Sequence, residues 1–91
     1  MRLVGLIGGM SWESTAEYYR IMNEEVAARV GGLSSARLIL SSVDFGPFAA
    51  RMKSGDWDGI RADLVREAVR LRDAGAEALV LAAQGDGGHI G

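Results

Sequence analysis

The stretch Leu3-Val4-Gly5-Leu6-Ile7-Gly8-Gly9 decides the fold of this 91-residue chain. Its short apolar run is closed by two glycines, which is typical of a buried strand that ends in a tight turn. A helix is predicted next, over residues 14–30, because Ser14-Thr15-Ala16-Glu17 fits a capping box and Gly31-Gly32 supplies a helix stop. One apolar stripe at helical spacing supports it, formed by Tyr19, Met22, Val26 and Val30.

Two more strands are predicted, over residues 36–43 and 78–83. Leu38-Ile39-Leu40 is continuously apolar, which favours a sheet covered on both faces. One or two helical turns are expected over residues 48–53, and a longer helix follows with Asp58 as its N-cap and Gly75 at its end. The residues predicted to line the buried face of that longer helix are Ile60, Leu64, Ala68 and Leu71.

Alternating strands and helices predict an α/β fold with a three-stranded parallel sheet in the order 2-1-3 and helices on both faces. The length allows one small domain, which we place at residues 1–84, followed by a glycine-rich flexible tail at residues 85–91. The net charge of −2 and the lack of a Lys/Arg cluster give no footprint for nucleic acid. No apolar run approaches the roughly 20 residues of a membrane span, so we expect a cytoplasmic protein.

Metal and thiol chemistry find few ligands in this sequence. The chain has no cysteine, which removes disulfides, thiolate metal sites and thiol nucleophiles. Its one histidine, His89, lies two residues from the end, so a histidine-based metal site within one chain is not expected. We therefore predict no bound metal.

The candidate site is the glycine turn after the first strand, from Gly8 to Ser11. Ligands of open α/β sheets bind beyond the carboxyl ends of the strands, which here places a crevice between this turn and residues 82–84. The glycines at 5, 8 and 9 match neither a phosphate loop nor a dinucleotide fingerprint, and a small carboxylate fits a short turn better. Another hypothesis is that the turn binds a nucleotide or phosphate, and the structural alternative is a tight turn that binds nothing.

Side chains around the turn have structural interpretations as well. Trp12 is expected to pack and Glu13 to face the helix dipole, whereas Asp44 is expected to close an Asx-turn. Gln84 points toward the crevice by position, but its neutral amide can only orient a ligand and cannot move a proton.

The octet from Gly8 to Thr15, Gly-Gly-Met-Ser-Trp-Glu-Ser-Thr, followed by Tyr18-Tyr19, resembles the N-terminal signature of the aspartate/glutamate racemase family. The resemblance extends over about residues 2–81. It implies half of a two-domain α/β architecture and a cofactor-independent isomerase in which two thiols exchange the Cα proton of an amino acid. It also implies that Gly9, Met10 and Ser11 contact the carboxylate of the substrate.

The sequence departs from that family where the first catalytic cysteine belongs. Ala82 occupies its position, and Gln84 stands where the family usually has Asn. We therefore expect a truncated racemase-like chain with no catalytic residue of its own, inactive alone. The alternative is a non-catalytic α/β module that binds small anions or assembles with itself, as a homodimer through an exposed sheet edge.

Overall fold

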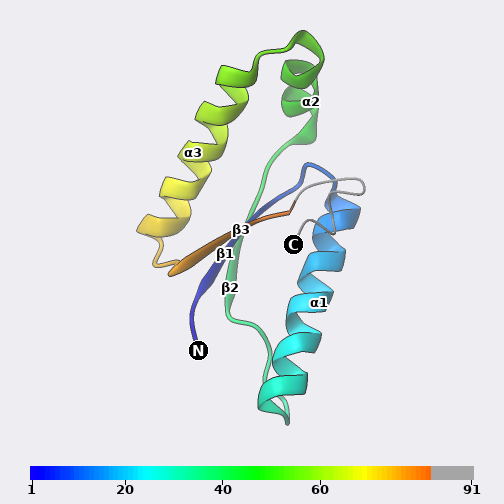
Figure 1. Ribbon diagram of the computed structural model, residues 1–91, viewed down its shortest axis with the longest axis vertical. Helices are drawn as coiled ribbons and strands as arrows, with labels where there is room; N and C mark the ends of the chain where they lie inside the picture. The colour runs from blue at the N-terminus through cyan, green and yellow to red at the C-terminus, as the bar shows by residue number, and fades with distance from the viewer. Residues whose placement is uncertain (83–91) are drawn as a thin grey trace.

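The computed structural model describes residues 1–82, in which three strands alternate with helices (Figure 1). Residues 83–91, which include Gln84 and the predicted tail, lie outside the described part. The elements follow in the order β1 (Val4–Gly8), α1 (Trp12–Val30), β2 (Leu38–Ser42), α2 (Phe45–Ser54), α3 (Trp57–Asp73) and β3 (Ala78–Leu81).

The sheet has the predicted topology. All pairing is parallel, and the strand order is β2-β1-β3, with Val4 of β1 opposite Leu38 of β2 and Ala78 of β3. Helices α1 and α3 lie on opposite sides of this sheet (Figure 1). The carboxyl ends of all three strands therefore meet at one edge of the sheet, where β1 turns into α1 and β2 turns into α2.

The core forms around β1 because, of the strands within residues 1–82, this one alone has a neighbour on each side. Leu6 is fully buried, and Ile7 packs with Met10 and with Leu71 of α3. Gly5 lets α3 approach closely, since a Cβ atom at this position would lie 3.1 Å from Leu71 Cβ. The lack of a side chain at Gly5 in the central strand thus sets the separation between the sheet and α3.

The two longer helices begin earlier than predicted. Helix α1 starts at Trp12 with Ser11 as its N-cap, because Ser14 uses its backbone N–H to donate to Ser11 Oγ (3.4 Å) and so lies inside the helix. Helix α3 starts at Trp57, since the carboxylate of Asp56 accepts from Gly59 N (3.0 Å) and Asp58 lies in the first turn. The predicted caps Ser14 and Asp58 are therefore wrong.

Helix α2 is also longer than the predicted residues 48–53. Asp44 is its N-cap and accepts a hydrogen bond from Gly46 N at 3.1 Å, the local turn expected from the sequence. Pro47 lies in the first turn of the helix, where its missing N–H has no intrahelical role. The loop after β2 is consequently only two residues long, and α2 begins at the carboxyl edge of the sheet.

The sheet is less covered than the continuous apolar run in β2 predicts. Leu40 in β2 and Leu79 and Leu81 in β3 are each more than two-fifths exposed. Of the predicted stripe on α1, Tyr19 and Val30 are also exposed. One helix on each side cannot shield both outer strands, so the central strand is buried and the flanking strands are covered only in part.

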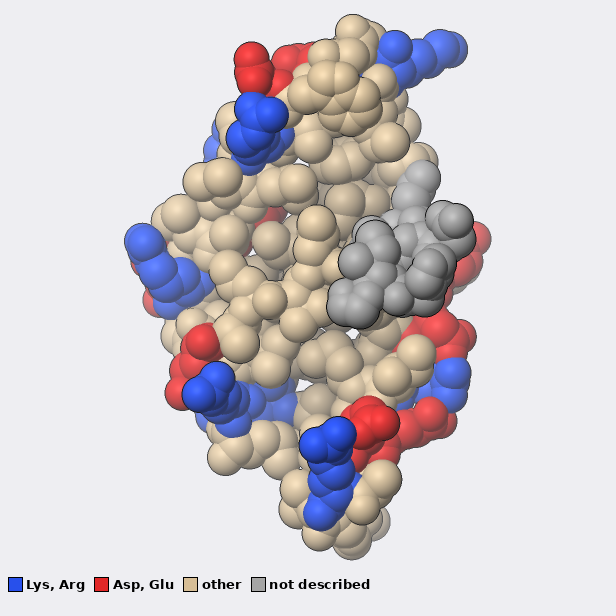
Figure 2. All heavy atoms as spheres, in the orientation of Figure 1, with Lys and Arg blue, Asp and Glu red and all other residues tan. Residues whose placement is uncertain are grey.

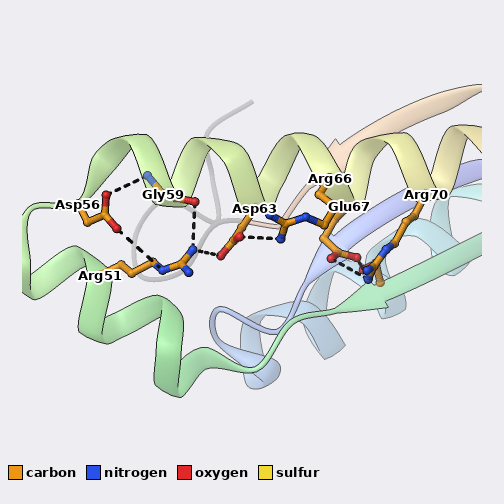
Figure 3. Close-up of polar contacts among 8 residues, drawn as sticks. Arg51, Asp56, Gly59, Asp63, Arg66, Glu67 and Arg70 are labelled. Carbon is orange, nitrogen blue, oxygen red and sulfur yellow. Dashed lines mark hydrogen bonds and ion pairs between the residues drawn. The ribbon is translucent and has the colours of Figure 1, made fainter.

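A cluster of ion pairs fixes α2 and α3 relative to each other (Figure 3). The guanidinium of Arg51 in α2 donates to Gly59 O (3.1 Å) and to the carboxylate of Asp63, both in α3. One turn further along α3, Glu67 accepts from Ser41 Oγ of β2 at 2.7 Å. These contacts tie the helical corner to β2 and thereby hold the loop that borders the glycine turn.

Candidate functional site

The turn between β1 and α1 is built by two glycines that leave no room for a side chain. Gly9 has φ +91°, and a Cβ atom there would lie 2.6 Å from Val43 N and 2.7 Å from Ser42 Oγ. At Gly8 a Cβ atom would lie 2.5 Å from Thr15 Cγ2. Val43 N also donates to Gly8 O at 2.8 Å. The turn is thus pressed between the end of β2 and the first turn of α1.

Thr15 is the polar centre of this turn, a role that the sequence pattern does not predict. Its side chain is only 5% exposed. Its Oγ1 accepts a hydrogen bond from Gly9 N (2.9 Å) and donates one to Ser11 O (3.1 Å). The spacing of Ser11 and Thr15, one helical turn apart after a Gly-Gly pair, is the signal that could have revealed it.

The three residues predicted to contact a carboxylate, Gly9, Met10 and Ser11, lie in different environments. The N–H of Gly9 is engaged by Thr15, and the side chain of Met10 is buried in the core with Ile7. Ser11 caps α1. Within residues 1–82 the backbone N–H groups of Met10 and Ser11 have no hydrogen-bond partner. A ligand at this turn would therefore meet backbone amides, while Gln84 lies outside the described residues.

The end of β3 lies beside the end of β1, as the strand order requires. Ala82 is buried, and its N–H donates to Ile7 O at 2.8 Å. Ala82, the residue after β3, is therefore hydrogen-bonded to β1 at Ile7, which lies three positions before Met10 in the chain. The predicted proximity of the glycine turn to the close of the third strand is therefore present in the structure.

Trp12 does not pack in the core as predicted, because it is 71% exposed. It borders a shallow hollow of about 290 Å³ between α1 and β2. The lining is almost entirely apolar and includes Tyr19 and Leu40. This hollow adjoins the turn on the α1 side and gives it one apolar wall.

The electrostatics of the turn come from the backbone. The N-terminus of α1 carries a partial positive charge, and the exposed Glu13 lies in its first turn. Hydrogen bonds to Glu17, and then to Glu24, raise the pKa of Arg20, but these three residues lie further along α1.

No group of three His, Cys, Asp or Glu side chains within residues 1–82 could hold a metal ion. In the same residues, no helix is long and apolar enough to cross a bilayer.

Comparison with known proteins assigns the chain to a family. A family model described as "Asp/Glu/Hydantoin racemase" matches residues 7–89, which begin just before the glycine pair. The chain belongs to this racemase family. Among solved structures it is similar to the protein named "putative Asp/Glu Racemase" from Yersinia pestis, with 48% sequence identity and a TM-score of 0.90.

The racemase relationship extends over nearly all of this chain but over a minor part of its relative. The match includes 92% of this chain and 36% of the Yersinia pestis chain. The α/β fold, the sheet order and the glycine turn are therefore those of a racemase-family segment.

The glycine turn should tolerate no side chain at Gly9. Gly9→Ala places a methyl group against the Val43 backbone in addition to straining a positive φ, whereas Gly31→Ala strains a similar φ (+88°) with no atom within 4 Å. Both variants lose about 1–3 kcal/mol to backbone strain, and Gly9→Ala loses roughly 1–3 kcal/mol more from overpacking. Urea unfolding of the two variants measures the difference. Equal losses would contradict the close contact with Val43.

Proposed function

We propose that this chain binds the carboxylate of an aspartate- or glutamate-like amino acid at the turn of Gly9, Met10 and Ser11. The observation that carries the proposal is the pair of unpartnered amides, Met10 N–H and Ser11 N–H, at the N-terminus of α1. Backbone amides in this arrangement suit an anion, and membership of the racemase family supports an amino acid as its source. Gln84, by its position in the sequence, is proposed to orient the same ligand.

The proposed contact follows from what racemisation requires. Removing a Cα proton leaves negative charge that spreads into the carboxylate, so donors at the carboxylate stabilise the reacting state. The reaction also needs one base to take the proton and an acid on the opposite face to return one. The family resemblance assigns both roles to thiols.

This chain lacks those thiols. It has no cysteine, and Ala82 occupies the position that the resemblance assigns to the first of them. The methyl side chain of Ala82 can neither take nor return a proton. We therefore propose a racemase-type half-site that binds the substrate carboxylate without catalysing cofactor-independent proton exchange on its own.

Carboxylate binding should perturb the turn selectively. Titration of the ¹⁵N-labelled chain with succinate is expected to move the amide signals of Met10 and Ser11, because these two N–H groups would donate to the ligand. Succinamide, which has the same skeleton but no charge, is the matched control and should move neither signal. Phosphate tests the alternative ligand. If phosphate moved these signals and succinate did not, the carboxylate assignment would fail.

The chain alone should leave the Cα proton of aspartate and glutamate in place. In D₂O the Cα–H signal of each L-amino acid is expected to decay in the presence of the chain no faster than in buffer alone, since no thiol is available to exchange it. Proton NMR over several days measures both rates. A decay that scales with protein concentration would show that another group acts as the base.

The second candidate function, self-assembly, is favoured by the outer strand β3. Its Leu79 and Leu81 side chains are 48% and 47% exposed, and β1 is its one strand partner within residues 1–82. Leu79 also borders an open groove of about 480 Å³ that Val65 and Val69 of α3 line. In Figure 2 the middle of the visible face, over β3 and the adjoining side of α3, is formed by uncharged residues.

We propose that a second copy of the chain pairs with this edge, because exposed strand edges present unpaired backbone groups to another strand. Light scattering during size exclusion should then give twice the monomer mass. The double variant Leu79→Thr/Leu81→Thr should return to the monomer mass, because it removes the apolar contact and introduces β-branched threonine, which suits a strand. Leu33→Thr is the control, as Leu33 is 103% exposed and lies in the loop before β2. A monomeric wild-type chain would rule out this function.

A further inference from the structure

One buried hydroxyl bonds to the backbone of both residues next to Met10, Gly9 and Ser11. Thr15 Oγ1 accepts the hydrogen bond from Gly9 N at 2.9 Å, and it donates its own proton to Ser11 O at 3.1 Å. With the side chain 5% exposed, water has little access to compete for either bond. The two hydrogen bonds and the backbone from Gly9 to Ser11 therefore form a small ring, which the hydroxyl closes.

The backbone part of this ring carries the two amides of the proposed carboxylate site. The peptide planes that carry Met10 N–H and Ser11 N–H lie between the two atoms that Thr15 binds. Between them, the Met10 side chain is anchored in the core beside Ile7 and Leu71. With both ends and the middle fixed, the two amides have little rotational freedom, so their orientation is set before a ligand arrives.

We infer that Thr15 is a positioning residue for carboxylate binding, an inference that rests on the proposed function. Thr15 does not touch the ligand, because its hydroxyl is already used on both sides by the backbone. It acts by orienting Met10 N–H and Ser11 N–H, and donors that are oriented in advance bind more tightly because less freedom is lost on binding.

The chemistry of the side chain explains why this position needs a hydroxyl. Ser11 O also accepts from Thr15 N (3.0 Å), so the partner that depends on the hydroxyl alone is Gly9 N–H. Only a group that donates and accepts at once can bond to Gly9 N–H and Ser11 O together, which serine can also do and valine cannot. The γ-methyl has a separate role, since it fills the space beside Gly8, where a Cβ atom would lie 2.5 Å from it. Hydroxyl and methyl can therefore be tested independently.

The experiment compares the succinate affinity of the full chain with those of Thr15→Val and Thr15→Ser, by amide titration. Thr15→Val keeps the shape and loses the hydroxyl with both of its hydrogen bonds, and it should weaken binding at least about fivefold, the factor that corresponds to one typical hydrogen bond. Thr15→Ser should bind within about threefold of wild type, because it retains both hydrogen bonds. Equal affinity of Thr15→Val and wild type would overturn the inference.

A second measurement covers a variant that fails to fold. In the wild-type chain, succinate should leave the Gly9 amide signal in place while it moves those of Met10 and Ser11, since Gly9 N–H is bound to Thr15. A Gly9 signal that moved most would overturn the inference, because that amide would then be donating to the ligand.

Failure of the proposed function is distinguishable from failure of this inference. If the wild-type chain bound no carboxylate, the proposed function would fall, and amide hydrogen exchange at Gly9 would still decide the role of Thr15. Slow exchange in wild type and Thr15→Ser with fast exchange in Thr15→Val supports the positioning bridge. The same exchange rate in all three chains contradicts it.

Discussion

The contact between Gly9 and the backbone of Val43 is the constraint on which the rest of the structure depends. No side chain fits between these residues, so the end of β1 and the end of β2 meet backbone to backbone. Because Val43 N also donates to Gly8 O, the direction in which α1 leaves the sheet and the position at which α2 begins are both set there. The glycine pair therefore organises the carboxyl edge of the sheet, including the amides proposed to bind a ligand.

The order of elements and strands was predictable because it depends on local signals: short apolar runs, helical stripes and glycine stops. The helix starts were not, because several residues near each start can serve as caps. Ser11 and Ser14 are equivalent by chemistry, and Ser11 becomes the cap because the Gly9 turn holds it at the helix entrance. The exposure of Leu40 and Tyr19 could also not be predicted from the hydrophobic pattern of the sequence, since it depends on how many helices cover the sheet.

A motif indicates the candidate site, and the structure shows which of its backbone amides are engaged and which have no partner within residues 1–82. The octet from Gly8 to Thr15 indicated the turn, but the side chain of Met10 turns into the core and Gly9 N–H is already bound. Whether an amide is engaged or unpartnered depends on α1 folding back onto the turn, which no local pattern reports. Thr15 was for this reason assigned to a capping box, whereas its hydroxyl bridges Gly9 and Ser11.

Recognition by main-chain atoms, as proposed for this turn, would have an evolutionary consequence. Met10 and Ser11 would present the same donors with many other side chains, so mutational drift at the surface of this segment, at Trp12 and Glu13 for example, can alter which molecules fit nearby without removing anion capture. The intolerant positions are those that shape the backbone from behind, Gly8, Gly9 and Thr15. A turn that bound its ligand in the proposed way could diversify its specificity while the contact to main-chain amides stayed unchanged.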